Sequence, residues 1–515
     1  MRLAALIAAG FLLAASCAAA QTPRPRVTLR AGALEGVAAE SGAIFKGIPF
    51  AQPPVGDLRW RPPAAPKSWK GARDASAPGA ACAQFVRGAA TGEEDCLYLN
   101  IWTPEWPLRG RHPVMLWFFG GANSNGSANN PVFDGAALAK QGVVVVTANF
   151  RVGAMGFLAH PALSAESPKK SSGNYTLLDQ IEALRWIKAN IARFGGDPAR
   201  VNVFGQSSGS YDILLLMTSP LAKDLFVNAI AQSGQFLAYD GPMPKARAEE
   251  LGESIAADLK APSDGTLSYL RSLPAAQVME AAAKWLRTEP GTDTGLLTNI
   301  DGWVLPEAPA RVWAEGRQMA IPLLLGNNSR EITPQFPLEE VRRQIGAKYG
   351  DLAPRALDAY GLANGAAGNA DPLLGGAGSQ WMTDIVQRCP ANLEADWHAA
   401  KNPTWRYQFE RAIPGREAAG STHGAEVAFV FGALDRVADK PAFTPDDQKT
   451  SELMQGYWTR FVKTGDPNGA GAPEWPRAGG GRYMAFTADG PAAKENLQAA
   501  PCAVYRDWVL RELAR

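Results

Sequence analysis

The chain has 515 residues, of which 46% are hydrophobic and 20% charged, and its formal net charge is +1. This composition is typical of a soluble globular protein, and the absence of a basic block argues against nucleic acid as a partner. A prior of one domain per roughly 150 residues would allow three domains. We nevertheless expect a single domain over residues 21–515, because large α/β proteins keep one central sheet and place insertions in its loops.

The first twenty residues have the organisation of a secretory signal peptide. Arg2 precedes an apolar run from Leu3 to Ala15, and the segment ends in Ala18-Ala19-Ala20. Cleavage after Ala20 would give a secreted or periplasmic protein. Cys17 lies in an imperfect match to a bacterial lipoprotein box, so a lipid anchor at Cys17 is the alternative. No later stretch is long and apolar enough to span a bilayer.

Cysteine usage agrees with export. Without Cys17 the chain keeps an even set: Cys82, Cys96, Cys389 and Cys502. An even set is typical of disulfides in an oxidising compartment, and four cysteines allow three pairings. A zinc site is the alternative, but the spacing lacks C-x-x-C and the chain lacks H-E-x-x-H. We therefore expect no metal.

Several segments have clear periodicity. Residues 114–119 and 142–150 are apolar runs typical of buried parallel strands, and the first continues into Gly120-Gly121-Ala122. Apolar residues recur at helical spacing between positions 177 and 191, and Gly195-Gly196 supplies a stop. The runs 361–378 and 469–481 are the least specified, and we expect surface loops there.

A short strand, Val201 to Gln206, breaks into a glycine-flanked serine. Gly205 and Gly209 frame Ser207 in the pattern G-x-S-x-G. In a nucleophile elbow the serine occupies a strained turn between strand and helix, and small residues two positions away let the backbone pass closely. The pattern alone is weak in a chain with 52 glycines. The helix, turn and strand before it make Ser207 the candidate nucleophile.

The motifs around this elbow resemble those of the type-B carboxylesterase and cholinesterase family of α/β-hydrolases. They are Gly173-Asn174-Tyr175-Thr176-Leu177-Leu178-Asp179-Gln180, Phe194-Gly195-Gly196-Asp197-Pro198, Phe204-Gly205-Gln206-Ser207-Ser208-Gly209 and the signature Glu94-Asp95-Cys96-Leu97-Tyr98-Leu99-Asn100. The likeness covers nearly the whole chain, although Gln206 and Ser208 replace the usual Glu and Ala. It implies an α/β-hydrolase fold, in which helices flank both faces of a mostly parallel twisted sheet, and an enzyme without a cofactor.

The resemblance also implies an oxyanion hole built from backbone N–H groups of Gly121, Ala122 and Ser208. In this family the first loop usually has the sequence H-G-G-G-F. Here Ala122 stands at the position of the third glycine and Asn123 at that of the aromatic residue. Ala122 can serve if its position does not require a positive φ. By the same resemblance Ser233 hydrogen-bonds the triad acid, and Gln206 supports the triad without acting on the substrate itself.

The general base must be one of four histidines, His112, His160, His398 and His423. The first two precede Ser207, which conflicts with the order nucleophile, acid, histidine in this fold. His398 falls in a predicted helix, where we expect it to face solvent. His423 lies in His423-Gly424-Ala425-Glu426, which resembles the family motif H-G-x-E, and is therefore the predicted base.

The acid should follow a strand between Ser207 and His423. The segment from Ile321 to Glu331 resembles P-x-L-x-G-x-x-x-D-E, which places Glu331 at the acid. Asp301 is the rival carboxylate, in a motif that the family uses structurally. Arg330 replaces the usual Asp beside Glu331.

The family likeness favours the pairs Cys82–Cys96 and Cys389–Cys502. We predict a serine carboxylesterase that acts on a small-molecule ester, with an oligomeric state that the sequence leaves open. Arg330 and the polar residues near the site favour polar or polycarboxylate esters, such as fumonisin-type toxins, if the guanidinium reaches the pocket; otherwise it faces solvent or pairs with a structural carboxylate. The alternatives are a non-catalytic cholinesterase-like binding module and a lipase or peptidase on the same fold.

Overall fold

The computed structural model describes residues 24–239, 241–288, 298–334 and 337–515. The predicted signal peptide and Cys17 lie outside these ranges. An eleven-stranded sheet forms the centre of the molecule, in the order β20-β19-β18-β15-β12-β11-β9-β10-β8-β4-β3. Its strands are β3 (Val37–Ala38), β4 (Ala43–Pro49), β8 (Tyr98–Trp102), β9 (His112–Phe118), β10 (Val144–Ala148), β11 (Gly196–Gln206), β12 (Asn228–Gln232), β15 (Leu323–Asn328), β18 (Thr404–Phe409), β19 (Tyr483–Thr487) and β20 (Gly490–Lys494).

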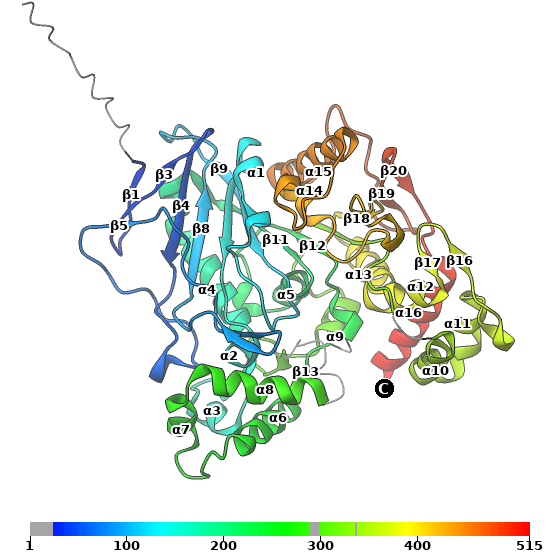
Figure 1. Ribbon diagram of the computed structural model, residues 1–515, viewed down its shortest axis with the longest axis horizontal. Coiled ribbons are helices and arrows are strands. Elements are labelled where there is room, and N and C mark those ends of the chain that lie inside the picture. The colour runs from blue at the N-terminus through cyan, green and yellow to red at the C-terminus, as the bar shows by residue number, and fades with distance from the viewer. Residues whose placement is uncertain (1–23, 240, 289–297, 335–336) are drawn as a thin grey trace, which may run out of the picture.

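The middle of this sheet is parallel and its edges are antiparallel. Every pairing from β10 through β9, β11, β12, β15 and β18 to β19 is parallel, whereas β8, β4, β3 and β20 pair in antiparallel fashion. Strands β9, β10, β12 and β15 are buried almost throughout. Continuous apolar runs are expected where helices cover both faces of parallel strands. The α/β-hydrolase fold is thereby confirmed (Figure 1).

Helices connect and cover these strands. The longer ones are α4 (Tyr175–Asn190), α5 (Ser208–Leu216), α6 (Lys245–Asp258), α8 (Ala275–Thr288), α10 (Leu338–Tyr349), α13 (Cys389–Ala399), α15 (Pro445–Thr464) and α16 (Ala499–Ala514). The shorter ones are α1 (Ala136–Lys140), α2 (Gly153–Phe157), α3 (Pro161–Glu166), α7 (Thr266–Ser272), α9 (Pro309–Ala314), α11 (Ala353–Ala359), α12 (Ala377–Thr383) and α14 (Val427–Phe431).

Small ribbons complete the fold. They are β1 (Arg26–Thr28) with β2 (Ala33–Glu35) and β5 (Ala72–Asp74), β6 (Gln84–Val86) with β7 (Ala89–Thr91), β13 (Met243–Pro244) with β14 (Asn299–Ile300), and β16 (Ala370–Asp371) with β17 (Gly375–Gly376). The last pair lies in the run 361–378, for which we expected loop alone. Leu373 and Leu374 donate to the Asp371 carboxylate at 2.7 Å, a local turn that fixes this ribbon.

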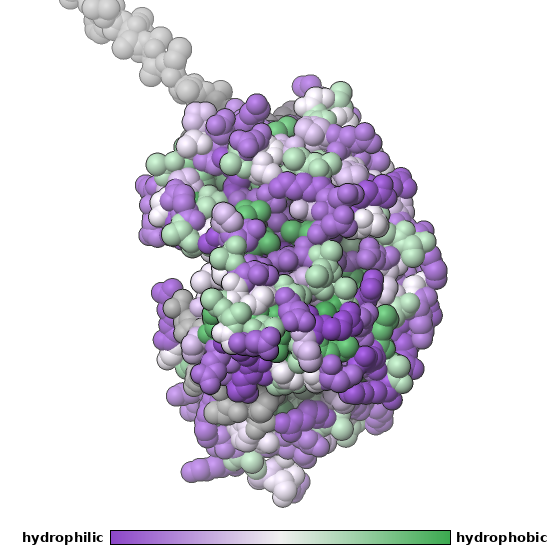
Figure 2. Space-filling model, turned by 90° about the vertical axis from the view of Figure 1, so that its right-hand side faces the viewer, coloured by the Kyte–Doolittle hydropathy of each residue, from purple (hydrophilic) through white to green (hydrophobic). Residues whose placement is uncertain are grey.

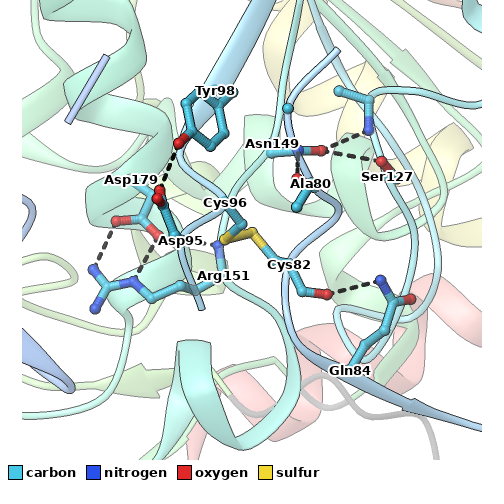
Figure 3. Close-up of a disulfide and its surroundings, with 12 residues drawn as sticks. Ala80, Cys82, Gln84, Asp95, Cys96, Tyr98, Ser127, Asn149, Arg151 and Asp179 are labelled. Carbon is cyan, nitrogen blue, oxygen red and sulfur yellow. Dashed lines mark hydrogen bonds and ion pairs between the residues drawn. A yellow bond between two sulfur atoms is a disulfide. The ribbon is translucent and has the colours of Figure 1, made fainter. Parts of the chain in front are cut away.

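Two disulfides cross-link the chain, one over a short loop and one over a long one. Cys82 is bonded to Cys96, and Cys389 to Cys502. Figure 3 shows the first beside a buried ion pair, in which Arg151 reaches Asp179 of α4 with two hydrogen bonds of 2.7 and 2.8 Å. Because both partners are buried and bonded in a bidentate manner, the pair fixes the start of α4 against the loop before α2.

The outer surface is mixed in character. On the face in Figure 2, hydrophilic residues dominate the ridges and hydrophobic ones appear mainly in recesses. Among the described helices none has the length and apolarity needed to cross a bilayer.

Candidate active site

Ser207 lies between β11 and α5 with a strained backbone. Its φ is 56° and its ψ is −128°, a conformation that is rare for a residue with a side chain. Its N–H donates to the Gln232 carbonyl of β12 at 2.8 Å. Gly209 allows the close turn, because a Cβ there would lie 2.1 Å from the Phe118 carbonyl oxygen. The elbow predicted from the sequence is therefore present in the backbone.

The three predicted triad residues lie in one hydrogen-bonded row. Nε2 of His423 is 2.8 Å from Oγ of Ser207, and Nδ1 is 2.7 Å from Oε2 of Glu331. Glu331 is 4% exposed and follows β15, while His423 comes from the loop before α14. A serine with a histidine that is itself oriented by a carboxylate is the arrangement needed for nucleophilic catalysis.

Neutral donors hold the Glu331 carboxylate in place. Oε1 accepts from Oγ of Ser233 at 2.7 Å and from the N–H of Asn328 in a short contact. Nε2 of Gln206 lies 3.2 Å from Nε2 of His423. Ser233 therefore bonds the predicted acid and Gln206 lies against the predicted base, and both residues also line the cavity described below.

A second carboxylate, Glu426, lies beneath the triad. It accepts from Nδ2 of Asn328 at 2.7 Å and from Nε2 of Gln232 at 3.2 Å. Burial and the nearby Glu331 charge raise the pKa of Glu426. Burial also lowers the pKa of His423, but the hydrogen bond to Glu331 and the charges of Glu331 and Glu426 outweigh it, so that the pKa of His423 is raised.

A cavity of about 400 Å³ opens over Ser207 and His423. Gly121, Ala122 and Ser208 line it, and in the described part of the chain the N–H groups of Gly121 and Ala122 donate to no backbone carbonyl. Ser208 is the first residue of α5, where N–H groups have no partner inside the helix. The three amides are thus available to a ligand oxygen at the serine.

Ala122 was expected to serve in the oxyanion hole if its position did not require a positive φ, and this condition is not met. Its φ is +53°, and Asn123 after it has φ +55°. A left-handed backbone brings Cβ close to the following carbonyl and costs an alanine about 1 kcal/mol or more. The loop therefore keeps the conformation that glycine would take freely, and surrounding contacts hold it there.

One of these contacts was not visible in the sequence. Nδ2 of Asn123 donates at 2.8 Å to Asp212 of α5, and Nε2 of Gln180 of α4 donates to the same carboxylate at 2.6 Å. All three side chains are buried, and burial raises the pKa of Asp212 to about 7. The sequence signal was a single charged residue in a helix that otherwise has none.

The structure separates the remaining candidates. Asp301, the rival carboxylate, is bonded to Ser171 and to the N–H groups of Trp303 and Leu305, so it closes a turn, as the family resemblance implied, and orients no histidine. His398 is fully buried rather than solvent-facing, because it bonds Gln318 and the Ile321 carbonyl.

Arg330 does not reach the pocket. Its guanidinium donates to three backbone carbonyls, those of Leu373 at 2.9 Å, Ala418 at 3.0 Å and Pro372 at 2.5 Å. It therefore ties neighbouring loops together, and recognition of a substrate carboxylate by Arg330 is not supported. Gln387, which sequence reasoning missed, does line the pocket, and its Oε1 has no hydrogen-bond partner among the described residues. It lies on a π-helical turn, Asp384–Arg388, a feature that is frequent at functional sites.

The fold and this row of side chains define an α/β-hydrolase with a serine, histidine and glutamate at the elbow. Residues 23–505 match the model of the carboxylesterase family. A fumonisin B1 esterase from Sphingopyxis macrogoltabida is 39% identical over 505 residues, covering 92% of this chain and 89% of the relative. A para-nitrobenzyl esterase from Bacillus subtilis is 33% identical over 478 residues, covering 87% and 92%.

Solved structures agree with these relatives. A PNB esterase superposes with a TM-score of 0.79 at 31% identity, covering 95% of this chain and all of the other. A Geobacillus stearothermophilus carboxylesterase gives 0.79 at 32% identity, covering 93% and 100%. The chain belongs to the carboxylesterase family, and it is a carboxylic ester hydrolase.

Proposed function

We propose that ester hydrolysis proceeds through an acyl-enzyme on Ser207. The hydrogen-bonded row from Ser207 through His423 to Glu331 carries this proposal. Oγ of Ser207 attacks the ester carbonyl while Nε2 of His423 takes its proton. The C–O bond breaks as His423 protonates the leaving alcohol, and water then attacks the acyl group through the same histidine. The amides of Gly121, Ala122 and Ser208 bind the oxyanion in both steps.

We also propose that the protein is exported and processed after Ala20. The two disulfides support this, because such bonds persist in oxidising compartments. Acylation of Cys17 would replace free secretion by a lipid anchor. Mass spectrometry of the exported protein distinguishes the two, since Gln21 at the N-terminus and a diacylglyceryl group on Cys17 exclude each other.

For the substrate we propose a polar ester that carries free carboxylates. Similarity to the fumonisin B1 esterase supports this class. The described lining carries no Lys, Arg, Asp or Glu, and Gln206, Gln387, Ser208 and Tyr211 are among the residues that supply its polar groups. A substrate carboxylate would thus be held by hydrogen bonds from neutral donors, with the side-chain Nε2 of Gln387 as the leading candidate.

The test compares kcat/KM for fumonisin B1 with that for p-nitrobenzyl acetate. The proposal predicts that fumonisin B1 is hydrolysed, and that Gln387→Leu lowers its kcat/KM by about tenfold relative to the neutral ester, since a hydrogen bond to a charged group contributes roughly 1.5–3 kcal/mol. Gln448→Leu, an exposed position on α15, is the control and should change neither value. Hydrolysis of the neutral ester alone would instead indicate the specificity named for the para-nitrobenzyl esterase relative.

A further inference from the structure

A second pocket lies beside the disulfide Cys389–Cys502, away from the catalytic serine. Its volume is about 170 Å³, and it is formed by α13, α16, β18 and the loop before β19. It shares no lining residue with the cavity over Ser207. We call it the arginine pocket, because its lining includes Arg406, Arg482 and Arg506.

Arg406 of β18 is a buried cation whose charge is incompletely paired. Only 3% of the residue is exposed, and Nη2 donates to Oδ1 of Asn327 at 3.0 Å and to the Arg388 carbonyl at 3.5 Å. Nε and Nη1 have no hydrogen-bond partner in the described part of the chain, and the guanidinium carbon lies 5.6 Å from the centroid of the Tyr483 ring. Buried N–H groups of a cation that lack acceptors are costly, so Nε and Nη1 favour an anionic ligand.

The Arg406 guanidinium keeps its proton at neutral pH. Burial, together with the nearby Arg388 charge, lowers its pKa to about 10. The nearby carboxylate of Asp384 does not neutralise Arg406, because Asp384 is paired with Arg388. Arg388 also donates to Gln408 and to the Ser329 carbonyl. The positive charge at the base of the arginine pocket therefore persists under physiological conditions.

The rim of the pocket adds further positive charge. Arg482 and Arg506 are exposed, and Nε of Arg482 donates to the Gly479 carbonyl at 2.9 Å. Asp396 is the one acid in the lining, against three arginines. Asn392 and Asn496 supply neutral polar groups. A small anion entering here would meet a net positive field that rises towards Arg406.

We propose that the arginine pocket binds a small oxyanion of two or more negative charges, with Arg406 as its buried ligand. Guanidinium groups match carboxylate and phosphate oxygens in a bidentate manner. The volume is below the roughly 300 Å³ of sites for drug-sized ligands, which limits the ligand to the size of phosphate or a short polycarboxylate. Phosphate and a short polycarboxylate share this oxyanion chemistry, and the experiment below distinguishes between them.

Isothermal titration calorimetry on the whole protein tests this, with inorganic phosphate in one arm and citrate in the other, at an ionic strength held constant with sodium chloride. The expected result is saturable binding of at least one anion, together with a thermal midpoint that rises with its concentration. Arg406→Met should weaken binding by at least tenfold. Arg477→Met, an exposed arginine outside the pocket lining, should bind as the wild type does.

Arg482→Met removes a charge at the rim without touching the core, and should weaken binding severalfold even if Arg406→Met fails to fold. Phosphate binding alone identifies a phosphate site, and citrate binding alone a polycarboxylate site. Equal affinity in the wild type and in both variants would overturn the proposal. So would the absence of saturation by both anions up to about 10 mM, a free energy weaker than about −3 kcal/mol.

Discussion

At the residue scale, the loop proposed to bind the oxyanion has a backbone conformation that its sequence does not favour. Ala122 has φ +53° where a glycine would be unstrained. Its neighbour Asn123 also has positive φ, which asparagine tolerates better than most residues. Ala122 is therefore the place in the loop where a side chain stores strain next to the nucleophile.

Ala122→Gly should relieve this strain. The free energy of unfolding should stay the same or rise by up to about 1 kcal/mol, because the loss of Cβ strain is partly offset by the greater entropy of glycine in the unfolded chain. Urea unfolding measures this. Ala122→Val is the matched contrast and should lose stability, since a branched side chain fits a positive φ poorly. A loss of more than about 1 kcal/mol in Ala122→Gly would show that Ala122 is not strained.

The charge of Glu426 is expected to set the pH range of catalysis. His423 must be neutral to act as a base, and Glu331 and Glu426 both raise its pKa. In Glu426→Gln one of these charges is lost, so the rising limb of kcat/KM against pH should move to lower pH. The exposed Glu417→Gln serves as control. A profile that does not move, with folding intact, would remove Glu426 from the electrostatics of the triad.

At the scale of elements, Asp212 links three segments at the proposed oxyanion hole. From α5 it accepts Nδ2 of Asn123 in the loop after β9 and Nε2 of Gln180 in α4. A carboxylate can accept a hydrogen bond from both side chains. An asparagine in its place would turn its own NH2 group, a donor, towards one of these two donors. This network is one of the contacts that hold the loop against α5.

Asp212→Asn should lower kcat by about 10- to 100-fold with a smaller change in KM, because the displaced amides act mainly in the transition state. The pH dependence of unfolding gives a second readout. The folded-state pKa of about 7 lies above the unfolded value near 3.9, so this carboxyl stabilises the fold at low pH, and that contribution is lost as pH rises through about 7. As the pH rises from about 4 to 7, the free energy of unfolding should therefore fall less in the variant than in the wild type. An unchanged kcat would mean that the loop holds its shape without Asp212.

Sequence patterns predicted the elements better than the contacts between them. The strand and glycine-framed turn at Ser207 are local, and the parallel core follows from buried apolar runs. The bond between Asn123 and Asp212 spans 89 residues, and the burial of His398 depends on Gln318, 80 residues away. The role of Arg330 also depended on a distant loop that offered carbonyl groups. Such pairings depend on tertiary packing, which no local pattern encodes.

For the whole molecule, the Cys389–Cys502 disulfide closes a loop of 113 residues between α13 and α16. On the chain-entropy estimate, a cross-link of this span adds about 4 to 5 kcal/mol to the free energy of unfolding. The Cys82–Cys96 bond, with a sequence separation of 14, would add about 3 kcal/mol.

Replacing both members of each pair by alanine should therefore lower stability more for Cys389 with Cys502 than for Cys82 with Cys96. Denaturant unfolding of the two double variants measures the difference. The reverse order would indicate that local packing around Cys82, rather than loop length, sets the contribution.

The most direct test of the mechanism is to label the nucleophile. Diisopropyl fluorophosphate forms a stable phosphoryl ester with an activated serine, and mass spectrometry of the digested protein locates it. The account predicts one adduct, on the peptide containing Ser207, with ester hydrolysis lost in proportion to labelling. It also predicts no adduct in Ser207→Ala, whose turnover should fall by a factor on the order of 10⁶ with the fold intact. Labelling at another residue, or near-normal turnover in Ser207→Ala, would contradict it.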